Sequence, residues 1–186
     1  MLKVEEKTNK IWLEEFDCFS ISGKDNKRFL NGLTTGNILN FENKVLKTCW
    51  LTPNGILKSL LEINQLEDKL DVLILEGDIN EVKKYFNDII FPLDDVLLSD
   101  SFSIYRLQEV DETNSWRKNQ PFFFKSKNDA FNFPLKNSNV LESDNLIIWK
   151  IKQAIPIMSK EINGKSNPLE LGLTDLIDFN KGCYLG

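Results

Sequence analysis

The clearest structural signal in the chain is VLKTCWLTPNGILKSLLEI, residues 45–63. Its two halves, residues 45–51 and 56–63, are apolar runs of the length and composition typical of strands. Between them lies Thr52-Pro53-Asn54-Gly55, in which proline presets φ for a turn and Asn-Gly tolerates a positive φ. The stretch therefore predicts a β-hairpin.

Similar patterns on both sides of the hairpin predict further strands and two helices. Apolar alternation indicates strands at residues 11–22, 70–75, 96–98 and 102–107. Helical spacing of apolar residues indicates a short helix at 24–33 and a longer one at 79–90, with Asp78 as its N-cap. Strand pairs interrupted by single helices favour an α+β fold with mostly antiparallel sheets and packed helices.

The second half of the chain is less regular. Residues 111–139 are rich in Asn, Lys, Ser and Asp and are expected to form a long excursion. Residues 146–157 resume an ordered apolar pattern that is broken at Pro156, and residues 160–168 form a polar loop. We expect one region over residues 1–186, with an inner subdomain over about 45–109.

Composition and charge exclude several classes of function. The 186 residues carry 23 Lys plus Arg against 28 Asp plus Glu, a net charge of −5, which argues against general binding of nucleic acid. No apolar run approaches the roughly 18 residues of a membrane span, and the N-terminus lacks the apolar core of a secretory signal. We therefore expect a cytoplasmic protein that does not enter a membrane.

The chain contains no histidine, which removes Ser-His-Asp and Cys-His catalysis and histidine-ligated metals. Its three cysteines are Cys18, Cys49 and Cys183, and they are too few and too far apart for a disulfide framework or a four-thiolate cluster. Cys18 and Cys49 lie in strand patterns and are interpreted as small buried hydrophobes. We expect no metal site and a reducing compartment.

Two residues near the C-terminus are candidates for chemistry. Cys183 lies between glycines in KGCYLG, two residues after Lys181, whose ammonium would favour the thiolate. From spacing alone, a small buried hydrophobe is the favoured interpretation of Cys183. Glu170, in PLELGL, is either a carboxylate that accepts N–H donors from a planar heterocycle or a solvated surface glutamate.

Two other patterns have simpler interpretations. Ser22-Gly23-Lys24-Asp25 lacks the glycine spacing of a phosphate loop and indicates a turn before a helix. The aromatic residues Phe122 to Phe124 and Trp149 are expected to fill a core rather than to stack on a ligand.

Four segments, in the expected order, resemble the YgfZ/GcvT-like folate-binding proteins, which are relatives of the glycine-cleavage aminomethyltransferase. The segments are ISGKDNKRFLNGL, LTPNGIL, the AIP of IKQAIPI followed by PLELGL, and KGCYLG. The last is the most specific, because it is similar to the K-G-C-Y-x-G-Q-E signature of the YgfZ branch, cut off after its glycine. The resemblance implies a GcvT/YgfZ-like fold without the small C-terminal β-domain.

The resemblance also implies a function. It indicates a protein that binds tetrahydrofolate or a derivative and assists the synthesis or repair of iron–sulfur enzymes. Its partners would be iron–sulfur client or assembly proteins, among which tRNA-modifying enzymes are candidates. By position, Cys183 is the signature cysteine with a thiol role, Lys181 is its companion, and Glu170, Lys181 and Tyr184 are implied folate contacts.

The chain departs from the family at informative positions. Lys58 and Ser59 stand where aminomethyltransferases carry a pair of aspartates, one of them catalytic, and neither supplies the carboxylate. Asn37 replaces the acid of a common T-N-D-V segment. These changes argue against aminomethyl transfer. A folate-dependent one-carbon (aminomethyl or methyl) transferase is the alternative function.

Overall fold

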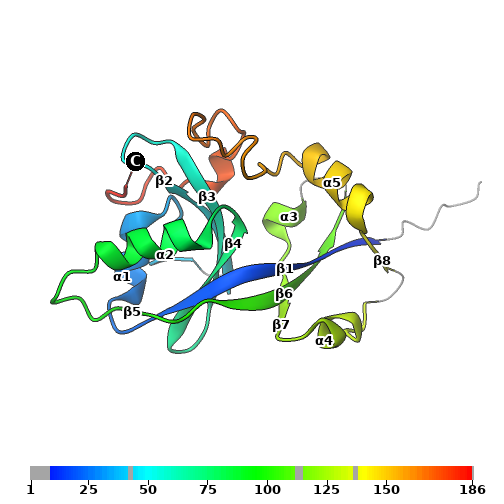
Figure 1. Cartoon of the computed structure of the whole chain (residues 1–186), viewed down its shortest axis with the longest axis horizontal. Coiled ribbons are helices and arrows are strands. Elements are labelled where there is room, and N and C mark those ends of the chain that lie inside the picture. The colour runs from blue at the N-terminus through cyan, green and yellow to red at the C-terminus, as the bar shows by residue number, and fades with distance from the viewer. Residues whose placement is uncertain (1–8, 42–43, 112–114, 136–137, 186) are drawn as a thin grey trace, which may run out of the picture. The chain divides into compact units, whose positions relative to one another are not determined.

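The structure is a computed structural model that describes residues 9–41, 44–111, 115–135 and 138–185. The chain forms two compact units. The first comprises Met1–Glu15 and Ile104–Ile155, and the second comprises Phe16–Ser103 and Pro156–Gly186. The chain passes between them within β1 (Asn9–Ser22), within β6 (Phe102–Val110), and after Ile155 (Figure 1). Most of the segment at 45–109, suggested as an inner subdomain, belongs to the second unit.

The second unit contains the predicted hairpin. Its strands are β2 (Val45–Leu51) and β3 (Leu57–Gln65), and β3 pairs in turn with β4 (Lys69–Glu76), all antiparallel. In the turn, the Thr52 amide donates to the Ile56 carbonyl at 2.8 Å, and Gly55 adopts a φ of +78°. The hairpin prediction and the strand predicted at 70–75 are thus confirmed.

The strand next to β4 in the sheet is the C-terminal part of β1. Residues Cys18 to Ser22 pair antiparallel with β4, and the short β5 (Leu97–Leu98) pairs antiparallel with the end of β1. The α+β fold with mostly antiparallel pairing is therefore as expected.

Two helices complete the second unit, α1 (Asn26–Leu33) and α2 (Ile79–Asp88). Asp78 caps α2 as predicted, because its carboxylate accepts from the Asn80 amide at 2.8 Å and also from that of Glu81. Phe86 of α2 is fully buried, and its ring packs edge-on against Phe19 of β1 and Trp50 of β2. The apolar faces of the helices and the strands thus share one core.

The first unit contains short elements that the sequence did not predict. They are α3 (Ser115–Lys118), β7 (Phe122–Phe124), α4 (Lys127–Phe131) and β8 (Ser138–Val140), followed by α5 (Ser143–Lys152). Strand β7 pairs antiparallel with β6, and β8 pairs parallel with the start of β1. The expected excursion at 111–139 thus contains helices and strands. The sequence did not predict them, because elements of three to five residues are too short to show periodicity. Residues 112–114 and 136–137 of that excursion lie outside the described residues.

The core of the first unit is built on three tryptophans. The ring centroid of Trp12 lies 5.4 Å from that of Trp149 and 6.5 Å from that of Trp116. The buried guanidinium of Arg106 stacks 4.3 Å from the Trp12 centroid. The interpretation of Trp149 as a core residue is confirmed, whereas Phe122 is 44% exposed, although its ring centroid lies 4.4 Å from that of Phe133.

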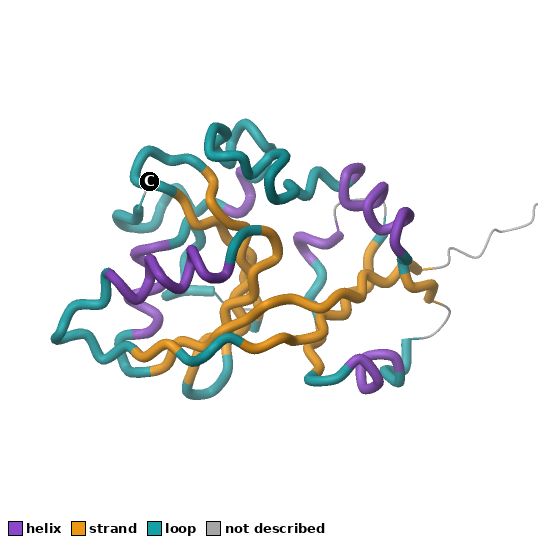
Figure 2. The backbone as a smooth tube through the Cα atoms, viewed as in Figure 1, coloured by secondary structure: helices purple, strands orange, loops and turns teal. Residues whose placement is uncertain are grey.

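Residues 156–186 return to the second unit mainly as loops (Figure 2). The described part of this segment includes the 3-10 turn η1 (Thr174–Leu176), whose Leu176 is buried. None of the helices in the described part of the chain combines the length and apolar character needed to cross a bilayer.

Candidate functional site

The C-terminal motif KGCYLG docks on the end of α1. The Lys181 ammonium donates to the carbonyls of Asn31 and Thr34, both at 2.6 Å, and to that of Gly36 at 2.7 Å. The Leu185 amide donates to the Gly32 carbonyl at 3.0 Å. The last carbonyls of a helix lack partners within the helix, and a cation there complements the helix dipole. The motif therefore closes α1 from the far end of the chain.

Asp178 holds the same segment from its other side. Its amide donates to the Thr35 carbonyl at 2.9 Å, and its carboxylate accepts from the amides of Asn180 at 2.8 Å and Lys181 at 3.2 Å. The Asn37 side-chain amide donates to the second carboxylate oxygen at 2.9 Å. The bond from Asn180, and then that from Asn37, hold the pKa of Asp178 below its usual value. An amide at position 37 therefore pairs with Asp178, where an acid would repel it.

Lys181 and Tyr184, two of the implied folate contacts, lie against each other. The Lys181 ammonium sits 4.8 Å from the centroid of the Tyr184 ring. An ammonium has three N–H donors, and three main-chain carbonyls already accept from Lys181. Lys181 thus anchors the motif, and the contact of Lys181 and Tyr184 with folate stays a prediction.

Cys183 is exposed, and its thiol is free. It lies between the two anchors, Lys181 and Leu185, so its backbone is held in place on both sides. Cys18 and Cys49 are buried, as expected, and burial raises the pKa of the Cys18 thiol. Among the three cysteines, Cys183 alone presents its sulfur to a reagent or a partner.

Glu170 is exposed and takes part in a closed single turn. Its carboxylate accepts from the Asn167 amide at 3.0 Å, while the Asn167 side chain accepts from the amides of Leu169 at 2.9 Å and Glu170 at 3.0 Å. This reciprocal pattern is a capping box. Gly172, with a φ of +69°, ends the turn, and its amide donates to the Leu169 carbonyl at 3.1 Å.

Glu170 thus has a structural role in stabilising this turn. The proposed contact of Glu170 with a pterin stays a prediction. Among the described residues, no hydrogen bond or ion pair joins Glu170 to Cys183. Neither of them is among the residues that line the cavity next to the motif.

That cavity, of about 400 Å³, lies in the second unit and shares Asp178 with the anchor of the motif. Carboxylates, phenyl rings and side-chain amides form most of its polar and aromatic wall. The lining residues are Gly36, Asn37, Asn40, Phe41, Leu46, Lys47 and residues 175–180. Such a wall suits a flat heterocycle that donates N–H bonds.

Sequence reasoning did not select Asp178 as a site residue. A carboxylate offers about four acceptor positions, and three are already used here, so one remains for a ligand. One sequence signal could have pointed to Asp178. It precedes Asn180 and Lys181 in the spacing of an Asx-turn, in which the carboxylate accepts from the amides that follow.

We expect Lys181 to titrate near pH 8. Burial lowers its pKa from the ordinary 10.5 to about 8, although Asp178 opposes the shift. Between these two pH values the unfolded chain binds more protons than the folded one, so the contribution of Lys181 to stability rises with pH. The free energy of unfolding of the wild type, minus that of Lys181→Met, should increase from pH 8 to pH 10.5. A difference that stays constant over this window would contradict the expectation.

No protein-family model matches the chain, and no curated protein matches it. Among solved structures, it is similar to the glycine cleavage system aminomethyltransferase T from Bartonella henselae, with a TM-score of 0.45 and 12% identity. The match covers 54% of this chain and 29% of that enzyme.

Proposed function

We propose that this chain is a tetrahydrofolate-binding accessory protein that assists the synthesis or repair of iron–sulfur enzymes. One observation carries the proposal: KGCYLG is anchored by Lys181 and Leu185 beside a cavity, and the Cys183 thiol between these anchors is exposed. The sequence motif that resembles the YgfZ branch thus has a defined place next to a volume for a small molecule.

The cavity is where we place the pterin. A reduced pterin presents ring N–H and amino donors, and the remaining acceptor position of Asp178 suits such a donor, with Asp175 on the same wall. Phe41 and Phe179 supply apolar area for a flat ring. Lys47, which also lines the cavity, forms an ion pair with buried Glu62 at 3.1 Å.

The iron–sulfur role is supported by the resemblance of KGCYLG and by the exposure of Cys183. An exposed thiol on an anchored backbone is accessible to a client or assembly protein, whereas buried Cys18 and Cys49 are not. Cys183 is therefore the proposed point of contact with iron–sulfur partners.

The alternative is a folate-dependent one-carbon transferase, and its aminomethyl form finds less support. Lys58 forms an ion pair with Glu81 of α2, and Ser59 is fully buried and donates to the Glu76 carbonyl at 2.8 Å. Both side chains are engaged in holding β3 to its neighbours, and neither is a carboxylate.

Tetrahydrofolate titration of the full chain by calorimetry tests the folate site. We expect saturable binding that Asp178→Asn weakens by about tenfold or more, the loss of one charge-assisted hydrogen bond. Asp68→Asn, on the exposed turn after β3, is the matched control and should bind like the wild type. Glu170→Gln is titrated in parallel, so that the pterin contact can be assigned to the carboxylate of Asp178 or to that of Glu170. Absence of saturable binding, or unchanged affinity in Asp178→Asn with a native thermal midpoint, would refute the cavity assignment.

The thiol is tested in the same series with Cys183→Ser, which exchanges only sulfur for oxygen. This variant should bind tetrahydrofolate like the wild type. In cells that lack the gene, it should fail to restore the activity of iron–sulfur enzymes that the wild-type chain restores. Equal restoration by both would remove the thiol from the proposal and leave folate binding untouched.

A further inference from the structure

Helix α5 exposes an apolar face to solvent. Ile147, Ile148 and Ile151 are 51%, 51% and 60% exposed, although isoleucine is among the residue types that are most often buried. They stand at i, i+1 and i+4, which places them on one side of the helix. Three neighbouring exposed isoleucines form a patch, unlike the single apolar residues that are normal on a protein surface.

The opposite side of α5 is fixed to the core of the first unit. Trp149 and Gln153 are buried, and the Trp149 indole N–H donates to the Asp111 carbonyl at 3.1 Å. Lys150 is also buried, and its ammonium pairs with the Glu14 carboxylate at 2.7 Å. A rotation of α5 that buried the isoleucines would break these contacts. The exposure of the apolar face therefore follows from the packing of the first unit.

Opposite charges flank the apolar face at equal distances. Asp144 lies four residues before Ile148 and Lys152 lies four residues after it, so all three share one side of the helix. Both charged side chains are exposed, and neither forms an ion pair with any residue that the structure describes. The face thus carries one acid and one base, each about 6 Å along the helix axis from Ile148.

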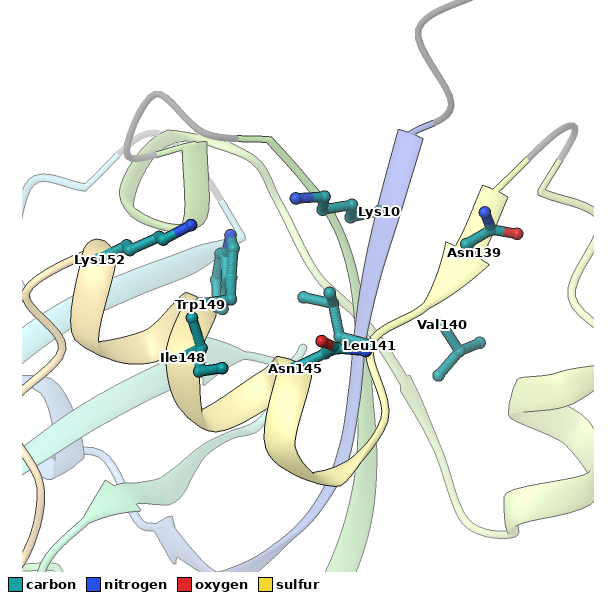
Figure 3. A pocket seen from close by; sticks show the side chains of 8 residues that line it. All are labelled: Lys10, Asn139, Val140, Leu141, Asn145, Ile148, Trp149 and Lys152. Atoms are coloured by element: carbon teal, nitrogen blue, oxygen red, sulfur yellow. The ribbon is translucent and has the colours of Figure 1, made fainter.

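A cavity of about 340 Å³ lies beside this face (Figure 3). Asn145, Ile148 and Lys152 line it from α5, and Val140 and Leu141 add apolar surface from the end of β8 and the residue that follows. Packed helices place the side chains of one into the depressions of the other. The cavity therefore gives room for an isoleucine from a second helix.

We propose that two copies of this chain pair through α5, with the helices antiparallel and centred on Ile148. A two-fold axis at that point places Asp144 of each copy level with Lys152 of the other, so that two ion pairs flank a shared apolar contact. Parallel helices would instead bring like charges together at both ends. A face with one acid and one base is complementary to a copy of itself, whereas a uniformly acidic or basic partner would meet one like charge.

The size of this contact indicates a weak dimer. A helix of ten residues is about 15 Å long, whereas a standard interface buries about 800 Å² on each partner. The pair is therefore expected at high protein concentration rather than as a permanent dimer. It does not depend on the proposed folate site, whose residues belong to the second unit.

Sedimentation velocity of the full chain over a concentration series tests the pairing. We expect a monomer–dimer equilibrium with a Kd between about 10 μM and 1 mM. Ile148→Ser should weaken it by about tenfold or more, because Ile148 lies at the centre of the contact. Leu93, which is 95% exposed and lies outside α5, supplies the matched control Leu93→Ser, which should dimerise like the wild type. A chain that stays monomeric over this range, or a dimer that both variants weaken equally, would overturn the proposal.

Charge exchange supplies the second test. Asp144→Lys and Lys152→Glu each bring like charges together at both ends of the antiparallel pair, so each should weaken dimerisation by about fivefold or more. The double variant restores both ion pairs with their signs exchanged and should dimerise like the wild type. If the two charges served only the dipole of their own helix, the double variant would be the least favourable of all. A double variant that has native helix content by circular dichroism but does not recover would contradict the pairing.

Two exposed residues outside α5 control for overall charge. Asp68→Lys and Lys165→Glu make the same changes in net charge as the two α5 variants. They should leave dimerisation unchanged. Equal weakening by all four single variants would show that only the net charge matters, and it would contradict the antiparallel pair.

Discussion

Replacing Lys47 by methionine is expected to lower the free energy of unfolding by about 3–5 kcal/mol. The Lys47 ammonium lies 3.1 Å from the Glu62 carboxylate, and their side chains are 3% and 0% exposed. The two residues are directly paired across β2 and β3. Removing the ammonium takes away the counter-charge that Lys47 supplies to a carboxylate inside the sheet. Chemical denaturation of the variant measures the loss.

A double-mutant cycle provides the control for this pair. Lys47→Met combined with Glu62→Leu replaces both charges by apolar groups of similar length, which in other proteins is often close to neutral. We expect the double variant to be more stable than either single variant, with a coupling energy of about 2 kcal/mol or more. Additive losses in the double variant would show that the pairing itself contributes little.

Replacing Gly23 by alanine is expected to cost about 2–4 kcal/mol, which is the second large effect. Gly23 has a φ of +97°, and a Cβ there would lie 2.1 Å from the Asp95 carbonyl oxygen. Asp95 cannot move freely, because its carbonyl accepts from the Asp25 amide at 3.2 Å and its amide donates to the Asp25 carboxylate at 3.0 Å. Thermal unfolding of the variant reports the cost.

Two other glycines serve as controls for Gly23. Gly32 lies in α1, and no atom outside its own helix and chain neighbours lies within 4 Å of the place that an alanine methyl group would take, so Gly32→Ala should raise stability by about 0.5–1 kcal/mol. Gly164 has a φ of +79° but open space around it, so Gly164→Ala carries the conformational cost alone. If Gly23→Ala were no worse than Gly164→Ala, the clash with Asp95 would not be the cause.

Local patterns predicted most of the second unit. The turn Thr52 to Gly55 and the cap at Asp78 are found as expected, because proline, Asn-Gly and an N-cap carboxylate act on atoms only a few residues away. The short elements between residues 115 and 140 were missed. They depend on partners distant in sequence, such as the pairing of β7 with β6 and of β8 with β1.

The candidate site divides in the same way. Cys183 was selected from its motif, and the structure shows it exposed. The anchoring role of Lys181 was not predictable, because its three acceptors lie about 150 residues earlier, on the end of α1. Asp178 was overlooked for a related reason, since its partner Asn37 and half of the cavity wall come from residues 36–47, far earlier in the chain.

From the sequence by itself came the α+β class, the hairpin, the helix cap and the choice among three cysteines, since each follows from near neighbours and residue chemistry. Only the tertiary structure decided which lysines meet a carboxylate in the interior and which close the end of a helix: Lys47 and Lys150 pair with buried or partly buried acids, whereas Lys181 donates to main-chain carbonyls at the end of α1. The residue type is the same in both settings. The free energy of a lysine side chain depends on its exposure to solvent and on nearby charges, and both are set only when the chain folds.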